Sequence, residues 1–293
     1  MKQRRLFFFF LFILCATGWQ PLHGQIAVEL QIKRRTFIRY EPIIANVVVT
    51  NLSGRDLMLR DGEAQWFGFQ INTASKGIVA PRNPDYHLDP LELKAGTTVK
   101  RTVNLNTLFS LGEFGIYRIK AQIYSDELGK YFSSRVNNIE ISEGQLLWQQ
   151  TAGVPDGMPN AGKMHTVSLL LWQGPIRQQL YCRIEDRDAG IVYCTCELGN
   201  LVAEIPPEVQ FDTANNVYIL AFAGPKTYVL YKLSVNGEFL GLTRYDAPKS
   251  RPTLRRLADG TLQIVGGHRE LAQTNVARPV PKLSDRPPGL PAN

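Results

Sequence analysis

The chain has 293 residues, a hydrophobic fraction of 44% and a formal net charge of +7. This length is enough for one or two domains whose cores fold without covalent staples. The basic excess is too mild to give the dense positive field that nucleic-acid binding requires, so we expect no nucleic-acid partner.

The first 24 residues predict a secretory signal peptide. Lys2, Arg4 and Arg5 form a positive n-region, residues 6–16 are all apolar, and a polar segment ends at Gly24. The apolar stretch is shorter than the roughly 20 residues that span a bilayer as a helix. We therefore expect cleavage of residues 1–24, export to the periplasm, the cell envelope or the extracellular space, and no transmembrane anchor in the mature chain.

Two features of this leader leave other export routes open. Arg4 and Arg5 resemble the core of a twin-arginine signal, although the very short n-region favours the general secretory route. Cys15 could accept a lipid, although Leu14 stands before it where a small residue is expected. Cleavage before Gln25 would remove three basic residues and no acidic one, which leaves a net charge of +4.

Residues 25–143 predict an antiparallel β-sandwich. Apolar and polar residues alternate along 26–33 and again along 43–49, which is the period of a half-buried strand. A strong turn signal follows at 51–54. We expect about seven short strands in this half, at 26–33, 43–49, 57–59, 66–71, 99–105, 117–123 and 136–141.

Two motifs in this half resemble those of bacterial extracytoplasmic immunoglobulin-like domains. The motif Tyr40-Glu41-Pro42-Ile43 leads into an alternating strand, and Gly115-Ile116-Tyr117 matches a step into the penultimate strand. The resemblance implies an immunoglobulin-like sandwich over residues 25–143. It also implies a structural role for Tyr117 as a tyrosine corner, whose hydroxyl is bonded to nearby backbone.

Residues 144–163 predict a linker or long loop, and residues 164–268 predict a second β unit. Glycine, proline and asparagine crowd the end of the first segment. In the second, Asn236-Gly237 between two β-rich runs is the strongest hairpin signal. Residues 211–220 resemble residues 256–265, and the 44 residues from Asn216 to Gly260 are close to the length of one propeller blade.

This repeat predicts about two propeller-blade-like antiparallel sheets in an all-β protein. Closed propellers need about four to eight blades, so the two would stack as a pair, pack against the sandwich or close through oligomerisation. Chance similarity between two hairpins is the alternative interpretation. The Pro-rich stretch 269–293 has little apolar content, and we expect it to be disordered.

Three cysteines remain after removal of the leader, namely Cys182, Cys194 and Cys196. Cys182 and Cys194 lie in neighbouring predicted strands and could form a cross-strand disulfide in an oxidising compartment. Buried free thiols are the main alternative. A metal site is disfavoured because a fourth ligand would be needed and no histidine lies nearby in the sequence.

One segment has the spacing of a metal site. Asp85, His87 and Asp89 alternate along an extended stretch, so their side chains could share one face and hold a divalent ion. Prolines on both sides mark a loop in which such residues are common. The stretch 186–190 contains Asp-x-Asp-x-Gly but lacks the downstream acid of a calcium loop, and we expect no cofactor.

Two sets of side chains are candidates for binding. Trp66 and Trp172 could stack on sugars, although sandwich cores commonly bury such residues. The densest basic cluster could contact acidic polymers, although solvated strand faces carry such charges too. Its candidate residues are Arg244, Tyr245, Arg251 and Arg255.

No nucleophile elbow or phosphate-binding loop occurs in the chain. We therefore expect a secreted or envelope protein that is not an enzyme and that acts through protein–protein contacts, with a partner protein or with itself. Carbohydrate binding, with a polysaccharide as partner, is the alternative function. A metal-dependent hydrolase built on Asp85, His87 and Asp89 is a second alternative.

Overall fold

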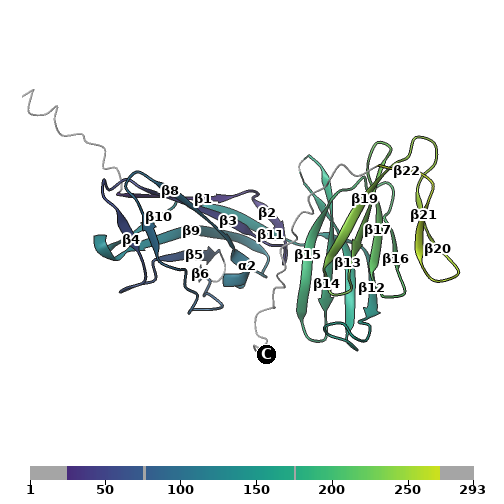
Figure 1. Cartoon of the computed structure of the whole chain (residues 1–293), viewed down its shortest axis with the longest axis horizontal. Helices are drawn as coiled ribbons and strands as arrows, with labels where there is room; N and C mark the ends of the chain where they lie inside the picture. The colour runs from purple at the N-terminus through teal and green to yellow at the C-terminus, as the bar shows by residue number, and fades with distance from the viewer. Residues whose placement is uncertain (1–24, 75–76, 175, 271–293) are drawn as a thin grey trace, which may run out of the picture.

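The computed structural model of the chain describes residues 25–74, 77–174 and 176–270. Regular structure in these residues is almost entirely β-strand, which confirms the predicted all-β class. Figure 1 shows two β units along the longest axis, the first from β1 to β11 and the second from β12 to β22. The predicted leader 1–24 and the predicted tail beyond Glu270 lie outside the described residues.

In the first unit, two sheets share one apolar core. The smaller sheet has the order β1 (Ile26–Ile32), β3 (Ile44–Asn51) and β8 (Thr98–Asn104). The larger has the order β2 (Thr36–Ile38), β11 (Asn137–Ser142), β9 (Gly115–Ser125), β5 (Phe67–Thr73) and β6 (Gly77–Ile78), with β10 (Lys130–Ser133) also on β9. Short elements complete the unit: β4 (Leu57–Leu59), β7 (Leu91–Leu93), α2 (Leu105–Leu108) and η1 (Asp126–Leu128).

Alternation along the strands explains this core. In β3, Ala45, Val47 and Val49 are buried while the residues between them are not, as the period of two requires. Tyr117 on β9 is buried, and its hydroxyl donates to the carbonyl of Glu113 at 2.9 Å. The hydrogen bond expected of a tyrosine corner is therefore present, while the immunoglobulin-like classification stays a prediction.

The second unit consists of two antiparallel sheets that run in sequence order and enclose one core. The first sheet contains β12 (Gln145–Gly153), β13 (Met164–Gln173), β14 (Gln178–Asp186) and β15 (Ile191–Asn200). The second contains β16 (Glu208–Phe211), β17 (Val217–Gly224), β18 (Thr227–Leu233), β19 (Phe239–Asp246) and β22 (His268–Arg269). A separate hairpin is formed by β20 (Thr253–Arg256) and β21 (Leu262–Val265).

The predicted linker 144–163 is wrong over its first half. Residues Gln145–Gly153 form β12 and pair with β13, so they belong to the second unit. The glycines and prolines that suggested a linker lie after this strand, in the loop between β12 and β13. Composition marked the loop correctly but hid the strand that precedes it.

The predicted repeat does not define the sheets. Residues 211–220 lie in β16 and β17, whereas residues 256–265 lie in the separate hairpin. Leu254 and Ile264 of that hairpin pack with Leu220 and Tyr228 on the outside of the second sheet. Two antiparallel sheets of four and five strands are present, but they do not coincide with the repeated segments, and a propeller-like classification stays a prediction.

Candidate functional site

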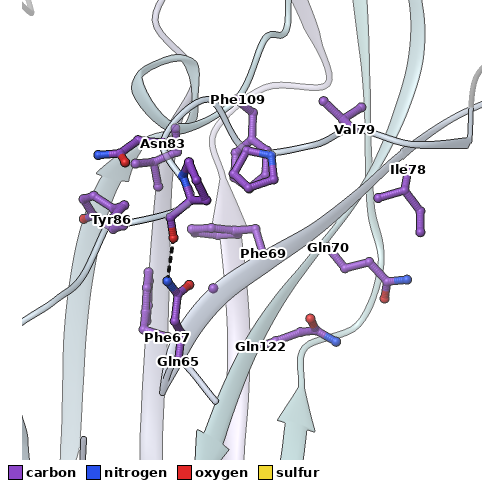
Figure 2. Close-up of a pocket in the computed structure, with 14 residues that line it drawn as sticks. Gln65, Phe67, Phe69, Gln70, Ile78, Val79, Asn83, Tyr86, Phe109 and Gln122 are labelled. Carbon is purple, nitrogen blue, oxygen red and sulfur yellow. Dashed lines mark hydrogen bonds between the residues drawn. The ribbon is translucent and has the colours of Figure 1, made fainter. Parts of the chain in front are cut away.

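The first unit contains a cavity of about 370 Å³ along the outer edge of β5, which we call the edge groove. Figure 2 shows its two kinds of lining. Aromatic rings come from Phe67, Phe69, Tyr86 and Phe109. Side-chain amides come from Gln65, Gln70, Asn83 and Gln122, and the remaining lining residues are glycine, proline or aliphatic.

The local sequence explains why a groove forms at this edge. On one side, β5 pairs with β9 along its whole length. On the other side, β6 pairs only with Asn72 and Thr73, and the amide of Val79 then bonds the carbonyl of Ile71 at 2.8 Å. The chain next turns away from β5, since Pro81 forms a bridge to Phe109 instead. The part of β5 from Phe67 to Gln70 is left beside a cavity.

Ring contacts fix the aromatic wall of the groove. Phe69 lies edge-on to Phe67 with ring centroids 5.4 Å apart, and edge-on to Phe109 at 6.3 Å. Phe67 is buried, whereas Phe69 keeps part of its ring exposed to the cavity. The opposite wall is held by Gln65, whose Nε2 donates to the carbonyl of Pro84 at 2.7 Å, as Figure 2 shows.

The groove is free of formal charge. None of its lining residues is Asp, Glu, Lys, Arg or His, although 20% of the chain is charged. Partial burial raises the pKa of Tyr86 above its ordinary value, so this phenol stays neutral at physiological pH. The lining can therefore bury apolar groups and exchange hydrogen bonds through its amides, and it offers no acid, base or nucleophile suited to catalysis.

A second site, which we call the joint, is a partly buried polar network between the two units. It consists of Arg34, Glu41, Tyr181, Arg183 and Glu197. Arg34 Nη1 donates to the Tyr181 hydroxyl at 2.6 Å and lies 3.6 Å from Glu197 Oε2, while Nη2 pairs with Glu41. Glu41 is only 4% exposed, so its carboxylate is almost completely removed from water.

Further contacts tighten the joint. Arg183 Nη2 donates to the carbonyl of Arg39 at 2.8 Å and lies 3.0 Å from Glu143 Oε1. Its guanidinium also lies over the ring of Tyr40, 5.4 Å from the centroid. Tyr40 has a φ of +67°, a left-handed conformation that costs a bulky residue free energy and persists where packing enforces it. The two units are thus held in one arrangement.

Burial and ion pairing oppose each other in the joint, and burial raises the pKa of Glu41 despite the nearby Arg34 guanidinium. Burial opposes the charge of Arg34, but Glu41 and Tyr181 outweigh it and raise the pKa of the guanidinium. Burial raises the pKa of the Tyr181 hydroxyl as well, so Tyr181 remains a neutral partner. Ile38, Leu170 and Tyr181 form a small apolar cluster around this network.

The predicted metal ligands do not assemble. Asp85, His87 and Asp89 lie in the loop between β6 and β7, where Nδ1 of His87 instead lies 2.6 Å from Oδ2 of Asp61. Across the described part of the chain, no group of three His, Cys, Asp or Glu side chains is placed to hold a metal ion. An extended spacing could not reveal that the loop turns between its residues.

The three cysteines are free and buried in the core of the second unit. The register places Cys196 opposite Cys182, whereas Cys194 lies opposite Ile184. The predicted partners Cys182 and Cys194 are therefore not direct neighbours across the strands. Burial raises the pKa of Cys182 well above its ordinary value, so its thiol is unreactive in the folded protein.

The two predicted tryptophans differ in exposure. Trp66 is 1% exposed, and its indole N–H donates to the carbonyl of Leu88 at 3.1 Å. Trp172 is half-buried and packs beside the apolar cluster at the joint. Trp66 therefore follows the alternative in which the sandwich buries it.

The predicted basic cluster does not converge on one surface. Arg244 and Tyr245 are neighbours on β19, so their side chains point to opposite faces of the sheet. Arg251 forms an ion pair with Glu208 at 3.1 Å. Arg255 is exposed on β20.

Sequence reasoning missed both the edge groove and the joint. For the groove, the run Gln65–Gln70 and the prolines of residues 81–90 were the available signals, since proline cannot continue a ladder. For the joint no local signal exists, because the hydrogen bonds that connect the two units join residues more than 100 positions apart.

Comparison of the chain with known protein families, with curated proteins and with solved structures finds no match. Among the described residues, no helix has the length and apolar character needed to cross a bilayer.

Proposed function

We propose that the chain is an exported, non-catalytic binding protein that acts through protein–protein contacts, with the edge groove as its recognition site. The observation that carries this proposal is an open, uncharged, partly aromatic cavity beside a strand edge that β6 covers only in part. Its volume of about 370 Å³ lies at the lower end of the range for ligand pockets, and suits one or two side chains of a partner.

The joint supports the same function. Its ion pairs, each with one buried partner, and the apolar cluster beside them would keep the second unit at a fixed orientation behind the recognition unit. A rigid arrangement lowers the entropy that is lost on binding. An immunoglobulin-like first unit and a propeller-like second unit, both predicted from sequence, are scaffolds of this kind.

The predicted leader supports export as the setting for this function. Residues 1–24 carry the basic, apolar and polar regions of a secretory signal in the required order. We place the mature protein in the periplasm, on the cell envelope or outside the cell, where its partner would be another exported polypeptide.

Carbohydrate binding is the second candidate, and the groove itself favours it. Amides together with aromatic rings also bind neutral sugars, and Gln70, Gln122 and Phe69 all line the groove (Figure 2). The candidate Trp66 does not support that function, because it is buried, and the half-buried Trp172 lies in the second unit, away from the groove.

Selection from a library of random linear peptides tests the proposal. We expect enrichment of peptides that bind the mature protein and lose at least tenfold in affinity when Gln70→Lys brings a charge into the groove. The matched control Gln150→Lys, on an exposed position of β12, should bind like the wild type. Circular dichroism verifies that both variants are folded.

Two outcomes would overturn the proposal. The first is failure to enrich any peptide, and the second is enrichment of peptides whose binding Gln70→Lys leaves unchanged. Binding to a glycan array that Gln70→Lys abolishes, without any peptide binding, would assign the groove to carbohydrates instead.

A further inference from the structure

We infer that the partner of the edge groove is an extended, uncharged polypeptide segment that joins the large sheet as a strand beside β5. The inference rests on the proposed function and specifies its partner and binding mode. The segment would run antiparallel to β5, in line with β6, and would place one apolar side chain in the cavity.

The hydrogen-bonding pattern of β5 supports this binding mode. The amide of Tyr124 donates to the carbonyl of Trp66 at 2.8 Å, so Trp66 faces β9. Because peptide groups alternate in direction along a strand, Gly68 and Gln70 also face β9, while Phe67 and Phe69 face the outer edge. The bond from Val79 to Ile71 on the outer side agrees with this alternation.

The outer peptide groups of Phe67 and Phe69 have no strand partner within the described chain. Among the described strands, only β6 lies on that side, and it pairs with Asn72 and Thr73. Unpaired backbone N–H and C=O groups at a sheet edge can bond another strand, and many proteins recognise peptides by adding them to a sheet in this way. The positions opposite Phe67 and Phe69 continue the line of β6, so a segment placed there would extend the pairing of β5 with β6.

The chain itself does not fill this position. After Val79 it leaves β5 and follows α2, where the amide of Arg82 donates to the carbonyl of Leu108 at 2.7 Å. The cavity is therefore bounded by β5 on one side and by the segment 79–86 on the other. The rings of Phe67, Phe69 and Phe109 line this cavity.

The cavity also defines the side chains of the partner. Residues opposite each other on neighbouring strands point to the same face. A residue opposite Phe69 would therefore point toward Phe69 and Phe109, while the residues on either side would point toward Gln70 and Gln122. The expected segment has an aromatic or large aliphatic residue flanked by uncharged polar residues, since a buried unpaired charge would be costly.

Backbone methylation of a peptide selected by the library tests the binding mode. Each backbone N–H is replaced in turn by N–CH₃, and the affinity for the mature protein is measured by calorimetry. We expect losses of at least tenfold at alternate residues around the apolar position, and less than about threefold at those between. A hydrogen bond of about 1.4 kcal/mol corresponds to the tenfold step.

Salt provides a second measurement on the same peptide. Because neither the groove nor the expected segment is charged, the affinity should change by less than about twofold between low and high ionic strength. A strong decrease with salt would contradict an uncharged contact.

The two proposals fail in different ways. If Gln70→Lys abolishes binding while no methylated position weakens it, the groove is the recognition site and strand addition is wrong. If losses occur at consecutive rather than alternate residues, strand addition is also wrong. If neither Gln70→Lys nor methylation matters, both proposals are wrong.

Discussion

The edge groove and the joint use opposite chemistry. The groove is open and uncharged, and it is lined by rings and amides, whereas the joint is closed and is built from two arginines, two glutamates and a tyrosine. Buried charges need fixed partners, because removing one leaves another unpaired. The comparison teaches that charged side chains are used in the contact between the two units, whereas the surface that we propose for a partner carries no charge.

The largest expected effect is a loss of stability when the joint is disrupted. Glu41→Ala would leave the Arg34 guanidinium and the Ile38 amide without their carboxylate, and we expect a loss of about 3 kcal/mol in the free energy of unfolding. Urea unfolding followed by circular dichroism measures this loss. The exposed control Glu238→Ala should stay within about 0.5 kcal/mol of the wild type, and a similar result for Glu41→Ala would contradict the role of the joint.

The strands that carry Tyr181 and Glu197 also carry the opposed cysteines. Opposite residues of an antiparallel pair have Cα atoms about 4.5–5.5 Å apart, within the range of a disulfide. Refolding with oxidised and reduced glutathione should transfer two electrons and two protons from Cys182 and Cys196 to glutathione disulfide, and form one bridge. That bridge should stabilise the protein by about 3 kcal/mol.

Peptide mapping by mass spectrometry identifies the bridge. Cys194→Ser should still form it, whereas Cys196→Ser should not, because only Cys196 lies opposite Cys182. A bridge that contains Cys194, or three free thiols after oxidative refolding, would contradict the prediction.

The carboxylate of Asp212, in the turn between β16 and β17, shows how a charge outside both sites contributes to stability. Asp212 accepts hydrogen bonds from the amides of Ala214 and Asn216 at 2.9 and 2.8 Å. Although partial burial acts to raise its pKa, these bonds and the Asn216 side chain hold the pKa of Asp212 below the ordinary 3.8. A lowered pKa stabilises the fold above about pH 3.8, and this stabilisation is lost as the pH falls through the lowered value.

Asp212→Asn should therefore cost about 1 kcal/mol at neutral pH, and the difference from the wild type should shrink in acid. Urea unfolding at pH 7 and pH 3 measures the two differences. An equal difference at both pH values would mean that the charge of Asp212 contributes nothing to stability.

The smallest expected effect on stability belongs to the groove. Gln70→Lys changes a half-buried side chain whose amide has no part in the joint or the core, so the free energy of unfolding should change by less than about 0.5 kcal/mol. The same substitution should abolish peptide binding. A loss of stability as large as that of Glu41→Ala would show that the groove is structural.

Part of the fold followed from the sequence because its signals are local. Alternation along Ile26–Ile32 and Ile44–Asn51 predicted two strands, and Asn236-Gly237 predicted the hairpin between β18 and β19. Sheets that run in sequence order, such as β16 to β19, need only neighbouring segments. The Tyr117 hydrogen bond spans four residues and was accessible through the resemblance.

The edge groove and the joint could not be predicted from the sequence, because contacts between distant segments of the chain form both sites. The groove depends on β6 ending after two residues and on Pro81 joining Phe109. The joint depends on Arg34 meeting Tyr181 across the two units. The metal prediction at Asp85, His87 and Asp89 was wrong for the same reason, since His87 found Asp61 in another loop.

Hydrogen exchange across the whole chain, with and without a peptide from the library, tests the central claim most directly. We predict slower exchange at residues 65–70 and 78–86, with the amides of Phe67 and Phe69 slowed most, and no change at the joint. Slower exchange confined to another part of the protein, with residues 65–70 unchanged, would contradict the assignment of the edge groove as the recognition site.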